Sequence, residues 1–120
     1  MRNFRNYDVW IDGIGFSIDI YKMTENFPKK ETYALCDQMQ RAAVSIPSNI
    51  AEGCSRKSVN EFAHFLEFSL GSSYEIETQL EIAVRLGYVN KEEFENAIDK
   101  VQSIEKRVTG LIHTLRPENV

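Results

Sequence analysis

Hydrophobic residues recur at every third or fourth position along almost the whole chain, and no stretch shows the two-residue alternation that is typical of a β-strand. Clusters of glycine, proline and polar residues interrupt this pattern at 26–30, 53–57 and 87–90. The pattern therefore predicts four helices and no sheet. The expected helix ranges are 6–25, 30–51, 59–86 and 91–115.

The short connections between these helices make each one run antiparallel to the next. Because 120 residues make one domain of ordinary size, we expect a single all-α domain over residues 1–120, an antiparallel up-down-up-down four-helix bundle that is left-handed. Ser58 with Glu61, and Asn90 with Glu93, have the spacing of a capping box that begins a helix.

Two residues of the second predicted helix bear on its course. Pro47 has no N–H to donate to the carbonyl of Ala43, so a kink or a short break is predicted there. Gly53 is placed to take the left-handed backbone conformation that often ends a helix.

The first helix carries two apolar stripes on nearly opposite sides. One stripe consists of Trp10, Ile11, Ile14, Ile18 and Tyr21, and the other of Val9, Gly13, Phe16, Ile20, Met23 and Phe27. A bundle core can bury only one of them, and an exposed apolar patch of this size usually marks an interaction site. We therefore expect self-association, with a candidate oligomer interface formed by Val9, Phe16, Ile20, Met23 and Phe27. Alternatively, the N-terminal segment or the loops fold over the second stripe.

A polar arc lies beside the apolar face of the second helix. Its members, with one carboxylate of the third helix, are Arg41, Ser45, Asn49, Glu52 and Glu75. Arginine presents a fork of donors that matches a carboxylate, so we expect Arg41 to meet Glu75 or Glu52 in a partly buried structural network. The alternative is a binding site for a polar ligand.

Motifs for catalysis or metal binding are weak. Glu61 and His64 have the Glu-x-x-His spacing of a di-iron bundle, but that site needs the motif twice, and His113 has Gly110 where the second glutamate would stand. No Gly-x-Ser-x-Gly turn is present, and the two cysteines form no CxxC pair. We predict no catalytic residue, cofactor or metal. Reduced thiols, and an N-terminus without signal-peptide or anchor pattern, favour a cytoplasmic protein.

The net charge of −4, with 42% hydrophobic and 27% charged residues, argues against a protein whose whole surface binds the phosphate backbone of nucleic acids. Basic residues nevertheless gather at the end of the predicted bundle that holds both termini, and they are Arg2, Arg5, Arg56, Lys57 and Arg116. A ring assembly would repeat this cluster around its axis. The cluster is our candidate nucleic-acid contact, with a solubilising loop surface as the alternative.

The stretch 41–53, RAAVSIPSNIAEG, resembles the signature of the 23S rRNA intervening-sequence protein family, also called four helix bundle proteins. The likeness covers nearly the whole chain and implies a bacterial, cytoplasmic bundle that forms a ring-shaped homopentamer. Some relatives are encoded within insertions in 23S rRNA genes, hence the ribosomal label that many carry. The family is also similar to the accessory variability determinant of diversity-generating retroelements, a pentamer that binds a reverse transcriptase and nucleic acid. Those proteins are strongly basic, whereas this chain is acidic.

The residues and the resemblance together predict a non-enzymatic homo-oligomeric scaffold, a pentamer by the resemblance, whose further partner is RNA or an RNA-bound protein. A protein-only interaction module and a cryptic enzyme are the alternatives. The family supplies no catalytic residues to carry over to this chain, and we expect neither a membrane nor a metal among its partners.

Overall fold

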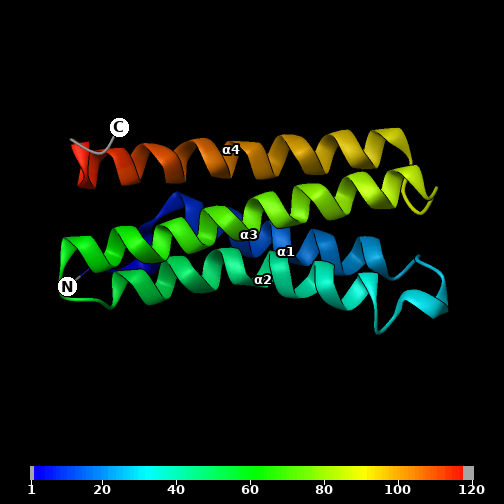
Figure 1. Cartoon of the computed structure of the whole chain (residues 1–120), viewed down its shortest axis with the longest axis horizontal. Helices are drawn as coiled ribbons and strands as arrows, with labels where there is room; N and C mark the ends of the chain where they lie inside the picture. The colour runs from blue at the N-terminus through cyan, green and yellow to red at the C-terminus, as the bar shows by residue number, and fades with distance from the viewer. Residues whose placement is uncertain (1, 118–120) are drawn as a thin grey trace.

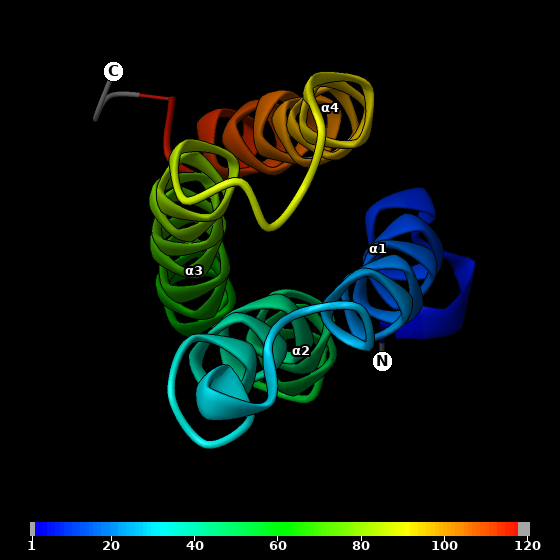
Figure 2. The same cartoon turned by 90° about the vertical axis from the view of Figure 1, so that its right-hand side faces the viewer.

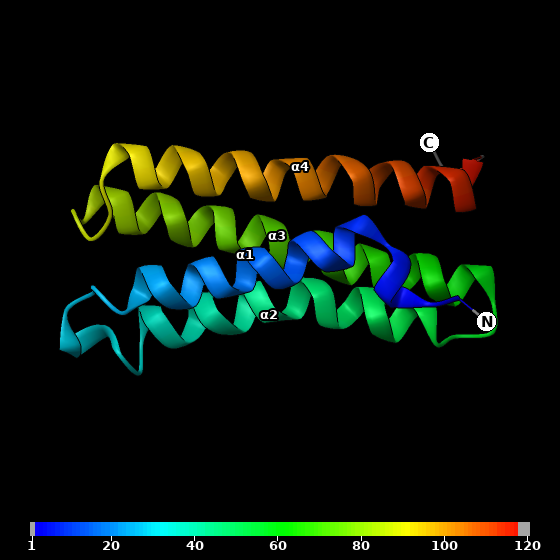
Figure 3. The ribbon, with the colours of Figure 1, turned by 180° about the vertical axis from the view of Figure 1, so that it is seen from behind.

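The computed structural model describes residues 2–117 and confirms the predicted all-α bundle (Figure 1). Its helices are α1 (Asp8–Thr24), α2 (Leu35–Cys54), α3 (Val59–Arg85) and α4 (Lys91–Leu115), and two short 3-10 helices, η1 (Phe4–Asn6) and η2 (Lys29–Glu31), precede α1 and α2. Successive helices run antiparallel, so the first and last of the described residues lie at the same end (Figures 1 and 3).

Seen end on, the four helices follow one another in chain order around a shared core (Figure 2). The molecule measures 44 × 23 × 21 Å. Two ion pairs cross from α1 to α4, with Lys100 Nζ 2.6 Å from Asp19 Oδ2 and Arg107 Nη2 2.7 Å from Asp12 Oδ2. Over residues 2–117, no helix combines the length and the apolar character that crossing a membrane requires.

The second helix differs from its predicted range at both ends, because it begins at Leu35 and continues to Cys54. The residues after Pro28 form the tight turn η2, in which the Glu31 N–H donates to the Pro28 carbonyl at 2.9 Å. Ala34 then takes non-helical dihedral angles, φ −120° and ψ −103°, so α2 starts only after it. The other three helices begin and end within two residues of the predicted positions.

Gly53 does not end α2 in the left-handed conformation, which corrects the prediction. It lies inside the helix, and the one residue with a positive φ among those described is Gly87, at 79°, just after α3. Gly53 is needed for another reason, since a Cβ at this position would lie 2.9 Å from the Cβ of Phe65. Glycine therefore lets α2 and α3 approach each other closely.

Of the predicted kink or short break at Pro47, the break does not form, because α2 continues through this residue. Proline leaves the Ala43 carbonyl without its helical donor, and the Ser17 hydroxyl of α1 donates to it instead, at 3.1 Å, while also contacting the Gly13 carbonyl at 2.8 Å. The helix α1 comes this close because Gly13 has no side chain, and a Cβ there would lie 3.2 Å from the Pro47 Cβ. A hydrogen bond between helices thus replaces the one that proline removes.

With this contact between α1 and α2, the stripe of α1 that contains Phe16 and Ile20 faces the core. Phe16 is 2% exposed and Ile20 is 0% exposed, and the remaining members are buried or packed against the core. The predicted oligomer interface is therefore corrected, because the following residues pack within one bundle: Val9, Phe16, Ile20, Met23 and Phe27.

Candidate interaction surfaces

With the second stripe inside, the other stripe of α1 lies on the surface. Ile14, Ile18 and Tyr21 are 38%, 50% and 48% exposed. Together with α2 they border an apolar groove of about 630 Å³, which we call the α1–α2 groove. Its main lining residues are Phe4, Trp10, Ile14, Ile18, Tyr21, Val44, Pro47 and Ala51.

Two cationic side chains, Arg5 and Lys22, border this groove. The Arg5 guanidinium lies 4.7 Å from the ring centroid of Phe4, whose ring packs edge-on against Trp10 at 5.1 Å. Lys22 also lines the groove. Neither Arg5 nor Lys22 has a carboxylate partner within residues 2–117. The groove therefore combines an apolar floor with a positive border.

A second exposed surface lies on α3, with apolar side chains toward its two ends and a charged residue between them. Phe68, Ile82 and Leu86 are 49%, 45% and 55% exposed. Their helical spacing places them on one side of α3 over about 27 Å. Glu75 lies between them on the same side, and its carboxylate accepts a hydrogen bond from the Gln79 amide at 3.3 Å. We call this surface the α3 face.

The predicted polar arc forms in part, between α2 and α3. The Ser45 and Ser72 hydroxyl oxygens lie 2.8 Å apart, and the Asn49 amide donates to the carbonyl and to the hydroxyl of Ser45, each at 2.8 Å. All three side chains are half-buried. The structure thus brings Ser45 and Asn49 together in a contact that joins the two helices.

Arg41 lies outside this network, which corrects the predicted pairing with Glu75 or Glu52. Its Nε pairs with Asp37 at 2.9 Å, one turn earlier on α2, and its side chain is 79% exposed. Asp37 is the nearer partner because residues four apart are neighbours on a helix surface. Glu52 is exposed, and Glu75 interacts with Gln79 instead.

Three of the predicted cations gather at the end of the bundle. They border a hollow of about 540 Å³, which we call the basic hollow and which is lined by Arg2, Cys54, Ser55, Arg56 and Lys57. Arg2 donates to the Arg56 carbonyl at 2.7 Å. The guanidinium groups of Arg2 and Arg56 lie 4.4 Å and 4.6 Å from the ring centroids of Phe62 and Phe65.

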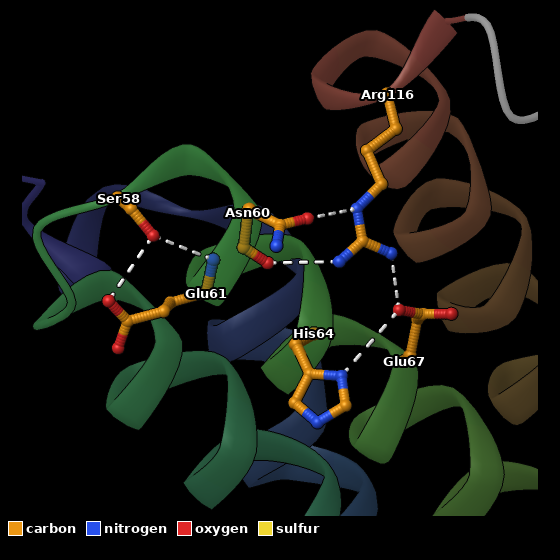
Figure 4. Close-up of polar contacts among 6 residues, drawn as sticks. All are labelled: Ser58, Asn60, Glu61, His64, Glu67 and Arg116. Atoms are coloured by element: carbon orange, nitrogen blue, oxygen red, sulfur yellow. Dashed lines mark hydrogen bonds and ion pairs between the residues drawn. The ribbon is translucent and has the colours of Figure 1, made fainter.

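Arg116, predicted as part of the same cluster, is engaged elsewhere (Figure 4). Its guanidinium pairs with the Glu67 carboxylate at 2.5 Å and donates to the side-chain and backbone oxygens of Asn60, each at 3.0 Å. The Arg116 side chain is only 17% exposed. It fastens the end of α4 to α3, and its charge is neutralised there.

The Glu-x-x-His pair of α3 does not converge on a common point. The Glu61 carboxylate accepts a hydrogen bond from the Ser58 hydroxyl at 3.2 Å at the start of the helix, while His64 Nδ1 lies 3.9 Å from Glu67 (Figure 4). In the part of the chain that the structure describes, no three histidine, cysteine, aspartate or glutamate side chains lie close enough together to hold a metal ion.

A half-buried acid between α3 and α4, Glu105, was not among the residues predicted from the sequence. The Oε2 atom of Glu105 is inaccessible to solvent and has no hydrogen-bond partner within residues 2–117. Burial and the neighbouring Glu77 carboxylate raise the pKa of Glu105 to about 8. The available signal was its position on α4, four residues after Val101 and three before Val108, where the helix is otherwise apolar.

The described residues therefore define a class, a four-helix-bundle protein with exposed apolar and basic surfaces. The family model for 23S rRNA-intervening sequence proteins matches residues 5–110, and the chain belongs to this family. A crystal structure of a protein of unknown function from the S23 ribosomal protein family of Bacteroides thetaiotaomicron is similar, with a TM-score of 0.79 and 26% identity over 87% of this chain and 97% of that chain. The comparison with curated proteins finds no match.

Proposed function

We propose that the protein is a non-enzymatic homo-oligomeric scaffold, assembled through its apolar surfaces and associated with RNA through its basic end. The observation that carries the proposal is the α1–α2 groove, where Ile14, Ile18 and Tyr21 are each more than a third exposed. Apolar surface left in water costs about 25 cal/mol per Å², and contiguous patches of this kind usually mark interfaces. A partner that covers the groove recovers this free energy.

The occupant we propose is a second copy of the chain, seated by its α3 face. Phe68, Ile82 and Leu86 offer exposed apolar side chains that could enter the groove of a second copy. Charge supports the same pairing, since Arg5 and Lys22 border the groove and Glu75 lies within the α3 face. The two surfaces differ, so the contact is heterologous, and a heterologous contact closes into a ring or extends as a filament.

The resemblance to ring-shaped pentamers favours the closed ring and five subunits. In the ring, each copy offers its groove to one neighbour and its α3 face to the other. An enzymatic role has no support in the clusters described above, and the proposed role is therefore to hold partners in a fixed arrangement.

Sedimentation equilibrium at micromolar concentration tests the assembly. Ile18→Glu places a charge in the groove, whereas Ile11→Glu is a matched control on the same helix, because both isoleucines are 50% exposed and Ile11 lies outside the groove. We expect Ile18→Glu to shift the mass toward the 13.8 kDa monomer and Ile11→Glu to leave it unchanged. A monomeric native protein would refute oligomerisation, and equal dissociation by both variants would refute the groove as its interface.

The RNA part of the proposal is supported by the placement of unpaired charge. Within residues 2–117, six basic side chains form ion pairs with carboxylates, and they are Arg41, Arg85, Lys91, Lys100, Arg107 and Arg116. Arg2, Arg56 and Lys57, which line the basic hollow, are not among them. The other described cations without an ion pair are Arg5 and Lys22 at the α1–α2 groove, and Lys29, Lys30 and Lys106. A ring repeats the basic hollow once per subunit, which raises the local positive potential despite the acidic total.

Fluorescence anisotropy with structured fragments of 23S rRNA measures RNA association. Binding that neutralises phosphates releases counterions, so the affinity should fall steeply between about 50 and 200 mM salt. Arg56→Gln combined with Lys57→Gln should weaken binding and flatten the salt dependence, whereas Lys29→Gln combined with Lys30→Gln, at the opposite end of the bundle, should change neither. If the native protein does not bind RNA at low salt, the RNA part of the proposal is refuted and a scaffold that binds only proteins is the better interpretation.

A further inference from the structure

The basic hollow has features of a site for one phosphate group, beyond a general positive charge. Three cations reach it from two segments that are distant in sequence, because Arg2 belongs to the N-terminal segment and Arg56 and Lys57 belong to the α2–α3 connection. No carboxylate of residues 2–117 forms an ion pair with any of the three.

The two arginines are held in place without an anion. Arg2 donates to the Arg56 carbonyl at 2.7 Å and stacks on Phe62, and Arg56 stacks on Phe65. Each guanidinium has five donors, and the donors that are not used within the protein remain for other partners. Much of the ordering that a ligand would otherwise impose is therefore already present, which favours binding.

Within residues 2–117, the other wall of the hollow adds no ionised acidic side chain. Burial raises the pKa of the Cys54 thiol, against a smaller opposing effect of Arg2, so the thiol is neutral near pH 7. The Arg56 N–H donates to the Gly53 carbonyl at 3.1 Å, which satisfies a carbonyl at the negative end of α2. A hollow of about 540 Å³ has room for a tetrahedral oxyanion.

We infer that the basic hollow binds a single phosphate group, held by the N–H edges of Arg2 and Arg56 and by the Lys57 ammonium. Arginine forks match phosphate oxygens in pairs, and lysine adds a point charge. The phosphate is supplied by RNA, by a free nucleotide or by inorganic phosphate. This inference rests on the proposed function for RNA as one source, whereas the site itself depends only on the geometry above.

Titration of the ¹⁵N-labelled protein tests the site, with amide shifts of residues 55–57 as the readout. The probes are inorganic phosphate, adenosine monophosphate, a short single-stranded RNA, and adenosine as the probe without phosphate. We expect the three phosphate-bearing probes to shift these amides saturably and adenosine to leave them unchanged. Lys57→Gln should raise each Kd at least fivefold, and Lys30→Gln at the opposite end should leave it unchanged.

The outcomes separate the site from the proposed function. Saturable shifts with inorganic phosphate and no RNA binding support the site and overturn the RNA part of the proposed function. RNA binding without phosphate-induced shifts at 55–57 overturns the site and leaves RNA association to other residues. Equal weakening by Lys57→Gln and Lys30→Gln overturns the site in favour of general charge attraction. Arg56→Gln should raise Kd as well, and if the loss of its stacking on Phe65 unfolds that variant, Lys57→Gln still decides the question.

Discussion

Glu105 makes the stability of the bundle depend on pH in a direction that is unusual for a carboxylate. One of its oxygens is buried between α3 and α4 without a hydrogen-bond partner among the described residues. Burial and the adjacent Glu77 carboxylate raise its pKa from the ordinary 4.5 to about 8. The substitution Glu105→Gln replaces the carboxyl by an amide of the same shape that stays neutral at every pH.

The sign and the size of the effect follow from the protons bound in each state. Between pH 4.5 and 8 the folded protein holds on Glu105 a proton that the unfolded chain has released. The free energy of unfolding therefore falls as the pH rises through this window, by at most about 1.4 kcal/mol per pH unit. Because Glu105 is only half-buried and solvent screens its charge, we expect a total loss of about 1–2 kcal/mol.

Urea unfolding followed by circular dichroism, at a fixed protomer concentration between pH 4.5 and 9, measures this loss. Native protein and Glu105→Gln should be similar near pH 4.5, and the variant should be about 1–2 kcal/mol more stable at pH 8.5. Glu95→Gln on the same helix is the matched control, because the Glu95 side chain is 58% exposed and should leave the pH dependence unchanged. Parallel curves for the native protein and Glu105→Gln would refute the raised pKa.

Three further predictions concern packing and surface charge. Ser17→Ala removes the donor to the carbonyl that the proline of α2 leaves free, so the free energy of unfolding in urea should fall by about 1–3 kcal/mol, and an unchanged value would show that another donor takes its place. Gly53→Ala sets a Cβ 2.9 Å from that of Phe65 and should cost about 1–3 kcal/mol in thermal unfolding. A Cβ at Gly71 would have no atom within 4 Å, so Gly71→Ala should raise the free energy of unfolding by up to about 1 kcal/mol. Equal effects of the two glycine substitutions would contradict the close approach of α2 and α3. Arg41→Ala should cost less than about 0.5 kcal/mol because its ion pair is exposed, whereas a loss near 3 kcal/mol in the same unfolding assay would indicate a buried network.

The helices were predictable where local chemistry and periodicity agree. The start of α4 is an example, since the Glu93 N–H donates to the Asn90 side chain at 2.8 Å and the Asn90 N–H donates to the Glu93 carboxylate at 3.1 Å. The start of α2 was not predictable in this way. Residues 29–34 contain no glycine or proline that would mark the boundary, and the dihedral angles of Ala34 separate that turn from the helix.

Side-chain partners were harder to predict than helices, because several acids compete for each base. Arg41 pairs with Asp37 four residues earlier, and this spacing is already visible in the sequence. Arg116 lies just past α4, and its contacts with Glu67 and Asn60 depend on how α4 packs on α3. Arg56 and Lys57, in contrast, both line the basic hollow as predicted from their positions next to each other in the chain.

The choice between the two stripes of α1 depends on Pro47, and the sequence held a clue to it. A proline inside a helix leaves one carbonyl unsatisfied, and a buried carbonyl needs a donor from another element. The inward side of α1 carries Gly13, which permits close approach, and Ser17, which can donate, whereas the other stripe has bulky Trp10 and Ile14 at the same level. Pro47 therefore favours this orientation of α1 together with the burial of Phe16 and Ile20, and the orientation leaves the α1–α2 groove on the surface. Pro47 thus links the fold to the proposed assembly, because its contacts with α1 accompany the orientation that leaves one apolar stripe for a partner.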